Sequence, residues 1–427
     1  MQPFRNRTVP MRYANVEFSI QDSRSGIPWR KGKYMKGFYA TAVMIVAVVI
    51  GLSLFVPQAF AQCEVKLGMI APLSGPAAQW GIAMRGATEL VAAEANEQGG
   101  LQVGSQKCKV SVISLDGKYT AEGAAAAANN LASQGVKFII GPIGAPEVAG
   151  VKPIAHRNGQ LVMCNSYAKD VIGPQWPLVF HLGTGPSAWA PPIVRVAKQK
   201  FGIKRVLVIA PNDQGGTDIG SVDAVAYRNN GIEAIEEYYQ RGTTNFAPIV
   251  TRIMNAKPDA VDTASSPPGD AGIMVKQLRQ AGFNGPIGRL GGPGTEEILR
   301  VAGGPEIVKN FYWYEAVYID NNVRAIAEKY TRVFHTSAPE NNFFYQFVAA
   351  ARMVTKAITK AGTADDTKKV AAALRSLPVE DPNLGKGLWI GQEFFKTNQE
   401  LSFPFGIGMI VNGKMQPSLK VEAATGK

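Results

Sequence analysis

Histidine and cysteine, the residues that most often act as catalytic bases, nucleophiles and metal ligands, are scarce here: the 427 residues contain three of each. The histidines are His156, His181 and His335. None belongs to a His-x-x-x-His pair or stands beside a pair of cysteines, so the spacing of a metal site is absent from the sequence. The sequence also lacks a Gly-x-Ser-x-Gly elbow and a Walker A loop. We therefore expect no enzyme, no metal and no cofactor.

Two other groups of residues match chemical motifs only in part. Asp365-Asp366 is a carboxylate pair, but it precedes an amphipathic helical pattern, where acids cap a helix and favour its first turn. Residues 291–294 (GGPG) share only their glycine content with a phosphate-binding loop. The basic residues beyond the N-terminal segment are scattered without interleaved aromatic residues, so we expect no nucleic-acid partner.

Half of the net charge of +12 lies in the first 61 residues. Residues 1–61 hold eight Lys or Arg and two acids, and their apolar run 38–56 is followed by Ala59-Phe60-Ala61. A basic stretch, an apolar run and small residues at −3 and −1 predict a secretory signal that starts at Met35 and is cleaved after Ala61, with 1–34 as an upstream extension. The alternative is an uncleaved membrane anchor, because the run approaches the ~20 residues that span a bilayer.

Disulfides are permitted in an exported chain. Cys63 precedes the strand-like run 64–70, and Cys108 precedes the run 109–115. If these strands are parallel neighbours, both cysteines lie at one sheet edge and can form a disulfide; the alternative is two separate thiols. Cys164 follows an apolar run and is expected to be a buried small side chain.

Short apolar strands alternate with helical patterns twice along the chain. This alternation predicts parallel sheets covered on both faces, in a doubly wound arrangement. The first run has strands at 65–71, 110–115, 138–140 and 161–164 and helices at 82–96, 121–134 and 146–157. The second has strands at 206–210, 232–239, 260–264 and 286–290 and helices at 220–230, 246–255 and 271–281.

The remaining segments are expected to connect two lobes, lobe I at 62–182 and lobe II at 183–317. Residues 173–192, rich in Pro, Gly and aromatic residues, are interpreted as the crossover. The tail 318–427 is expected to return to both lobes and complete them across the hinge. Its predicted elements are helices at 323–334, 343–361 and 368–377 and a strand at 405–411.

Several motifs in this order resemble the branched-chain amino acid-type periplasmic solute-binding proteins of ABC importers. They are the opening 65–76 (VKLGMIAPLSGP), Trp80-Gly81, 96–100 (NEQGG), 135–141 (GVKFIIG), 205–210 and 246–264. The resemblance covers most of the chain after residue 61. It implies an α/β, type I periplasmic binding protein fold: two doubly wound parallel-sheet lobes joined by a hinge, which close on a small-molecule solute.

Ligands of open α/β sheets bind beyond the carboxyl ends of the strands. From those loops and the resemblance we expect a binding site formed by Trp80, Tyr119, Gly144, Ala145, Ser166, Tyr167, Ala168, Trp189, Arg289 and Tyr345. The chain departs from the family where an α-ammonium is usually paired, because Gly291 and Gly292 fall near the position of the acid. This favours an aromatic or apolar carboxylate gripped by Arg289. If Glu147 or Asp213 replaces the acid, an amino acid is favoured instead.

The resemblance thus predicts a monomeric periplasmic receptor that delivers its solute to the membrane subunits of an ABC importer. Two alternatives remain open. The same fold can present a ligand to a membrane signalling partner, which an uncleaved anchor would favour. A secreted α/β enzyme is the other alternative, although no nucleophile or acid–base pair is apparent in the sequence.

Overall fold

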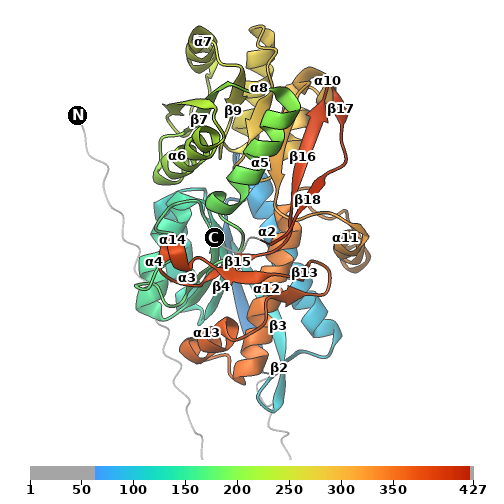
Figure 1. The fold of residues 1–427 in the computed structure, drawn as a ribbon. Helices are drawn as coiled ribbons and strands as arrows, with labels where there is room; N and C mark the ends of the chain where they lie inside the picture. Colours follow the sequence, from blue (N-terminus) through green and yellow to red (C-terminus); the bar gives the residue numbers. More distant parts are fainter. Residues whose placement is uncertain (1–62, 424–427) are drawn as a thin grey trace, which may run out of the picture. The chain divides into compact units, whose positions relative to one another are not determined.

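Two β-sheets organise residues 63–423, the part of the chain that the computed structural model describes (Figure 1). The predicted signal segment, its cleavage position and the upstream extension lie outside these residues. Between residues 63 and 423, no helix is long and apolar enough to span a bilayer. The sheet that contains the first strand of the chain, together with the elements packed on it, is called lobe I. The other large sheet and its elements are called lobe II.

The lobe I sheet has the strand order β14-β15-β6-β5-β4-β1-β3-β2. Its parallel strands are β1 (Glu64–Ala71), β3 (Gln106–Asp116), β4 (Phe138–Ile143), β5 (Leu161–Asn165), β6 (Val179–His181) and β15 (Glu400–Ser402). β2 (Leu101–Val103) and β14 (Leu388–Ile390) pair antiparallel at the two edges.

Helices cover both faces of this sheet, because successive residues of a strand point to opposite sides. Leu67 and Met69 pack with residues of α2 (Ala78–Glu97) and α12 (Phe343–Ala361). Ile70 packs with residues of α3 (Ala121–Ser133) and α4 (Ala145–Asn158) on the other face. The smaller elements are α11 (Asn321–Phe334), α13 (Thr367–Arg375), α14 (Gln392–Phe395), β12 (Glu380–Asp381) and β13 (Gly385–Lys386).

The lobe II sheet has the order β17-β16-β11-β10-β9-β7-β8, with β18 also paired to β16. Its parallel strands are β7 (Arg205–Pro211), β8 (Glu233–Tyr239), β9 (Ala260–Asp262), β10 (Ile287–Arg289) and β11 (Phe311–Glu315). β16 (Phe405–Val411) runs antiparallel to β11 and pairs with β17 (Lys414–Met415) and β18 (Leu419–Val421).

The lobe II helices also lie on both faces. α5 (Pro186–Phe201) and α6 (Gln214–Asn229) pack against Val206 and Val208. Leu207 and Ile209 of the same strand face the other helices instead. These are α7 (Ala247–Ala256), α8 (Pro268–Gln280), α9 (Thr295–Ala302) and the short α10 (Pro305–Val308).

The chain passes between the two sheets three times: from β6 to α5, from β11 to α12 and from β15 to β16. The last passage is the shortest, since β15 ends at Ser402 and β16 begins at Phe405. The tail beyond residue 318 therefore supplies strands to both sheets, as Figure 1 shows in orange and red.

The predicted crossover does lie within 173–192, between β6 and α5, but regular elements occupy part of the segment. This segment contains β6, which belongs to the lobe I sheet, and the first turns of α5. Pro191 and Pro192 interrupt the backbone hydrogen bonds of a helix, which is why the segment reads as irregular. Burial of the apolar face of α5, including Trp189 and Ile193, compensates for the lost hydrogen bonds.

The two cysteines at the start of β1 and β3 are joined. β1 and β3 are parallel neighbours, and a disulfide links Cys63 to Cys108. The backbone N–H of Lys109 also donates to the Cys63 carbonyl, at 2.8 Å. Cys164, in β5, is buried with a free thiol.

Candidate functional site

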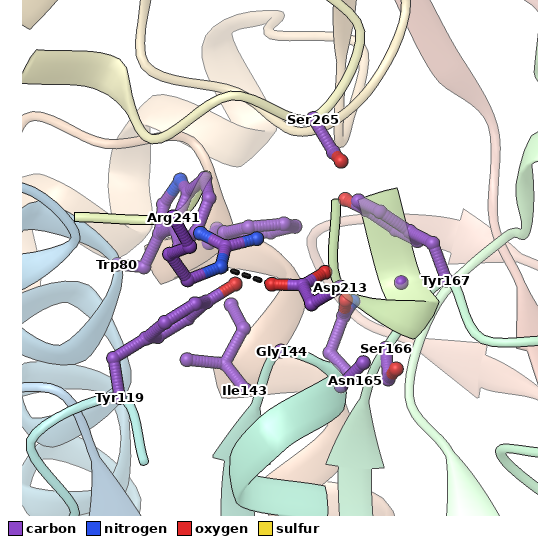
Figure 2. A pocket seen from close by; sticks show the side chains of 13 residues that line it. Trp80, Tyr119, Ile143, Gly144, Asn165, Ser166, Tyr167, Asp213, Arg241 and Ser265 are labelled. Atoms are coloured by element: carbon purple, nitrogen blue, oxygen red, sulfur yellow. Dashed lines mark hydrogen bonds and ion pairs between the residues drawn. The ribbon is translucent and has the colours of Figure 1, made fainter. Parts of the chain in front are cut away.

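A cavity lies where loops from the carboxyl ends of both sheets meet (Figure 2). It contains about 340 Å³ of space between atoms, a figure that includes solvent at its open side. Its lining residues are Trp80, Tyr119, Ile143, Gly144, Ala145, Asn165, Ser166, Tyr167, Asp213, Gly215, Arg241, Ser265 and Phe343.

Trp80 closes one side of the cavity from lobe I. It lies in the first turn of α2 and is 3% exposed. Its indole N–H donates to the carbonyl of Pro293 in lobe II, at 2.9 Å. The ring packs edge-on against Phe343 and tilted against Tyr119, with centroid separations of 6.4 and 6.0 Å. These contacts form an aromatic wall that bridges the two lobes.

Arg241 and Asp213 are the two charged residues that line the cavity, and both come from lobe II. The Arg241 Nε–H donates to the Asp213 carboxylate, as the dashed line in Figure 2 shows. Asp213 also caps α6, because its Oδ1 accepts the Gly216 N–H at 2.9 Å. Both Asp213 oxygens are therefore engaged, whereas the buried Nη1 of Arg241 has no hydrogen-bond partner in the protein.

A cation–π contact joins Arg241 to Tyr119 across the lobes. The guanidinium carbon lies 4.6 Å from the centre of the Tyr119 ring. Burial raises the pKa of Tyr119 to about 12, although the Arg241 charge opposes this rise. Burial alone would lower the pKa of Arg241, but Tyr119 and Asp213 outweigh it, so that its pKa lies above the usual value. Arg241 is therefore a permanent cation at the cavity wall.

Two helix N-termini point their backbone N–H groups toward this region. α4 starts at Ala145 in lobe I, and α6 starts at Gln214 in lobe II. They approach so closely that a Cβ on Gly215 would lie 2.7 Å from the Ala145 Cβ. Unbonded N–H groups at a helix start carry partial positive charge and favour an anion.

The loop after β5 supplies polar groups on the opposite side. The Ser166 N–H donates to His181 Nε2 at 3.2 Å, and the Ser166 Oγ accepts the Ala168 N–H at 3.2 Å. The Tyr167 hydroxyl is buried without a partner. His181 Nδ1 lies 2.9 Å from a Glu400 oxygen, and both side chains are buried. Because a backbone N–H can only donate, His181 Nε2 accepts, and Nδ1 carries the proton toward Glu400.

Six of the ten predicted site residues line the cavity: Trp80, Tyr119, Gly144, Ala145, Ser166 and Tyr167. The other four lie elsewhere. Ala168 faces a neighbouring hollow beside His181. Tyr345 lines a surface hollow next to Pro339, because it is two residues beyond Phe343 and so points from a different side of α12.

Trp189 and Arg289 lie behind the cavity wall. Trp189 is 1% exposed, stacks on Tyr314 with a centroid separation of 4.2 Å and meets Tyr167 edge-on. Arg289 is fully buried, and its Nη1 donates to the Ser266 carbonyl at 2.6 Å. Burial lowers the pKa of Arg289 to about 10. Trp189 therefore supports Tyr167, which lines the cavity.

Arg241 is the lining residue that sequence reasoning missed most clearly. It follows β8, and none of the ten expected site residues comes from the loop at the carboxyl end of that strand. The rule that ligands bind beyond the carboxyl ends of strands applies to this loop as well and would have found it. Phe343, in contrast, starts a helix of the tail, and its position depends on how the chain returns to lobe I.

The groups that line the site suit the binding of a small molecule. Within residues 63–423, no group of three or more His, Cys, Asp or Glu residues is arranged to hold a metal ion. The lining residues include no cysteine or histidine. Aromatic rings, helix N-termini and one arginine with a free donor are suited to holding a small molecule.

Comparisons with known proteins agree with this arrangement. A family model described as periplasmic binding protein matches residues 64–414. The Leu/Ile/Val-binding protein BraC3 of Rhizobium johnstonii is 26% identical over 376 residues, covering 87% of this chain and 99% of the relative. The isoleucine complex of LivJ from Streptococcus pneumoniae matches with a TM-score of 0.70 and 21% identity, covering 84% of this chain and 99% of that one. A solute-binding protein from R. palustris in complex with benzoate matches with a TM-score of 0.70 and 18% identity, covering 85% and 98%.

The predicted α/β fold with two lobes is confirmed by the sheets and by these structural neighbours. The family model spans most of the chain, and its members are solute-binding proteins of the periplasm rather than enzymes. The chain therefore belongs to the periplasmic binding protein family, as a type I member of the branched-chain amino acid ABC transporter type.

Proposed function

We propose that this protein is the receptor of an ABC importer and closes its two lobes on a small organic carboxylate with an apolar or aromatic body. The observation that carries the proposal is the unpartnered Nη1 of Arg241, beside an Asp213 carboxylate whose two oxygens are already engaged. Binding shifts the balance between open and closed lobes, and the closed form is recognised by the importer's membrane subunits.

The charges around the cavity favour an anion. A carboxylate can take hydrogen bonds from Arg241 Nη1, the N–H groups at the starts of α4 and α6, and the Tyr167 hydroxyl. An ammonium group has fewer partners in the cavity. Asp213 is the one acid among the lining residues, and its carboxylate is already paired with Arg241. The permanent charge of Arg241 makes a carboxylate without an ammonium group the better match.

The remaining walls favour an apolar body of modest size. Trp80, Tyr119, Tyr167 and Phe343 present rings, and Ile143 adds an aliphatic side chain. A flat aromatic ring can stack against such walls. Related folds have been solved with benzoate and with 4-hydroxybenzoate.

A branched-chain amino acid is the second candidate. Asp213 lines the cavity, and its carboxylate can accept a hydrogen bond from an α-ammonium group in place of the one from Arg241. The curated relatives named as binders of leucine, isoleucine and valine support this candidate. Glu147 is not available for this role, because it does not line the cavity.

Calorimetric titration of the purified protein with benzoate, 4-hydroxybenzoate, isoleucine and leucine separates the two candidates. We expect the aromatic acids to bind and the amino acids to bind more weakly. Arg241→Gln should weaken benzoate binding by about 10- to 100-fold, as expected for loss of a hydrogen bond to a charged group (~1.5–3 kcal/mol). Arg252→Gln is the matched control, because Arg252 is half exposed and pairs with Glu237 outside the cavity.

Strong binding of isoleucine with no binding of benzoate would favour the amino acid candidate. Failure of every small acid and amino acid to bind would overturn the receptor proposal. The importer role is tested separately by uptake of labelled benzoate in cells with and without this gene. A signalling receptor would bind the acid but leave uptake unchanged.

A further inference from the structure

Glu147 is a fully buried carboxyl directly behind the cavity wall. It lies in the first turn of α4 and is 0% exposed. Its Oε1 accepts the backbone N–H of Tyr119 at 2.9 Å, and its Oε2 has no hydrogen-bond partner. Among the ion pairs between residues 63 and 423, none involves Glu147, so its charge has no cation beside it. A carboxyl buried in this way needs an explanation.

The peptide group that Glu147 holds belongs to an unusual turn. Lys118 and Tyr119 both have φ of 57°, in the left-handed region that residues with a Cβ rarely adopt. Asp116 accepts the Lys118 N–H at 2.8 Å, and Glu147 accepts the next N–H along the chain. Gly117 leaves room for the Glu147 carboxyl, because a Cβ at Gly117 would collide with Oε1. The Asp116 and Glu147 carboxyls thus each accept the backbone N–H of one residue in the left-handed conformation.

This turn directs the Tyr119 ring into the cavity. Figure 2 shows the ring beneath the Arg241 guanidinium, and the two groups are 4.6 Å apart. The Tyr119 hydroxyl end lies against Gly144, at the start of the helix that carries Glu147. Glu147 touches no cavity space itself, so it acts on the binding site only through Tyr119 and through its charge.

The surroundings of Glu147 favour its neutral form. Burial raises the pKa of Glu147 to about 8; the backbone N–H groups of Tyr119 and Ile143 oppose the rise, and the Asp116 charge adds to it. On α3, which packs against α4, Glu122 in the first turn is exposed. Across the cavity, Arg241 and Asp213 are paired with each other. Above pH 8, the carboxyl therefore becomes a buried anion close to the site where we place the solute's carboxylate.

We propose that Glu147 is the positioning residue of Tyr119 and that the loss of its proton weakens the binding of an anionic solute. The second part rests on the proposed function, which assigns an anion to the cavity. The first part does not, because it concerns the conformation of a side chain in the protein alone. The two parts therefore need separate measurements.

The position of Tyr119 is measured without any ligand. Protein labelled with 3-fluorotyrosine gives a ¹⁹F resonance for Tyr119, which is assigned by its loss in Tyr119→Phe. Because the ring lies against Arg241, we expect this resonance to move in Glu147→Ala, which removes the acceptor, and to stay near its place in Glu147→Gln, which keeps it. It should also titrate with a midpoint near pH 8 in the natural protein, and not in Glu147→Gln.

Solute binding is measured with benzoate at pH 6.5 and pH 9.5. We expect the Kd to rise about tenfold between these values in the natural protein, as for a new charge acting at an effective dielectric near 20. Glu147→Gln should remove this rise. The control Glu122→Gln removes an exposed charge from the neighbouring helix start and should leave the rise unchanged.

The outcomes separate the two proposals. A Tyr119 resonance that is the same in Glu147→Ala, Glu147→Gln and the natural protein would overturn the positioning role, whatever the protein binds. A rise in Kd that persists in Glu147→Gln would overturn the charge effect. If benzoate and the other acids do not bind at all, the proposed function and the charge effect fail together, while the resonance of Tyr119 still decides the positioning role.

Discussion

The indole N–H of Trp80 in lobe I donates to the backbone carbonyl of Pro293 in lobe II, 213 residues further along the chain, at 2.9 Å. The Asn341 side chain donates to the same carbonyl at 3.2 Å. These bonds form only when the lobes are close together. The structure therefore represents a closed arrangement, and the residues that hold it closed can be tested one at a time.

Trp80→Phe keeps an aromatic ring in the cavity wall but removes the N–H that reaches Pro293. We expect the Kd for the bound solute to rise about 3- to 10-fold, because a buried hydrogen bond contributes ~0.5–1.5 kcal/mol. Small-angle scattering should show a larger radius of gyration at the same ligand concentration. Trp389→Phe is the control, because its indole N–H has no partner; a similar effect in this variant would contradict the role of Trp80.

Asp218 joins the two lobes through contacts that lie outside the cavity. On α6, it accepts the backbone N–H of Lys169 in lobe I at 2.8 Å, and the Lys169 ammonium lies 3.8 Å from its other oxygen. Asp218→Ala should weaken binding of every solute by one common factor, about two- to fivefold, because it changes the population of the closed form and not the cavity. Titrations with several acids check this. A changed order of preference among the acids would count against it.

The buried pair of His181 and Glu400 joins β6, β15 and the crossover into α5. Besides His181, Glu400 accepts the Gly185 N–H at 3.1 Å. His181→Leu leaves the Glu400 carboxyl buried with that one partner, so we expect a loss of about 3–5 kcal/mol in the free energy of unfolding, measured in urea. Combining it with Glu400→Leu should recover part of the loss. Additive losses would show that the two side chains do not act as a pair.

Asp223 and Asp262 are buried together in lobe II, and neither Asp223 oxygen has a hydrogen-bond partner. Burial raises the pKa of both carboxyls, that of Asp262 to about 6, and the Asp262 charge raises the pKa of Asp223 further. Since both folded-state pKa values exceed the unfolded value of 3.8, the stabilisation from their protons is complete below about pH 4. It is lost as the pH rises through the folded-state values.

Asp223→Asn removes one of these acids and should raise the free energy of unfolding at pH 8 by about 1–3 kcal/mol, with little change at pH 4.5. Urea unfolding at the two pH values measures both changes. The exposed Glu233 of the same lobe provides the control variant, Glu233→Gln. Destabilisation of Asp223→Asn at pH 8 would show that the Asp223 carboxyl is ionised and held by favourable contacts.

The sequence predicted regular elements well where apolar periodicity was strong. The predicted ranges of α12 and β16 match the structure at both ends, because most residues of both elements are apolar and buried. α5 was misread because Pro191 and Pro192 are poor helix residues, and only tertiary packing shows that they are tolerated. The aromatic β11 was not predicted at all, since its burial depends on pairing with β16 from the tail.

Within the site, the lobe I residues were easier to predict than those of lobe II. Trp80, Tyr119 and Ser166 follow recognisable strands or turns and line the cavity as expected. Arg289 was expected to grip the solute because it ends a strand, but it turns inward and donates to the Ser266 carbonyl. Arg241, rather than Arg289, lines the cavity. Which of the two arginines lines the cavity depends on packing that periodicity does not reveal.

The passage from β15 to β16 has a consequence for how the two lobes fold. β15 (Glu400–Ser402) pairs with β6 in the lobe I sheet, and β16 (Phe405–Val411) pairs with β11 in the lobe II sheet. Without the segment 400–411, each of the two sheets lacks a strand. One short segment therefore completes both sheets, which couples the folding of lobe I to that of lobe II.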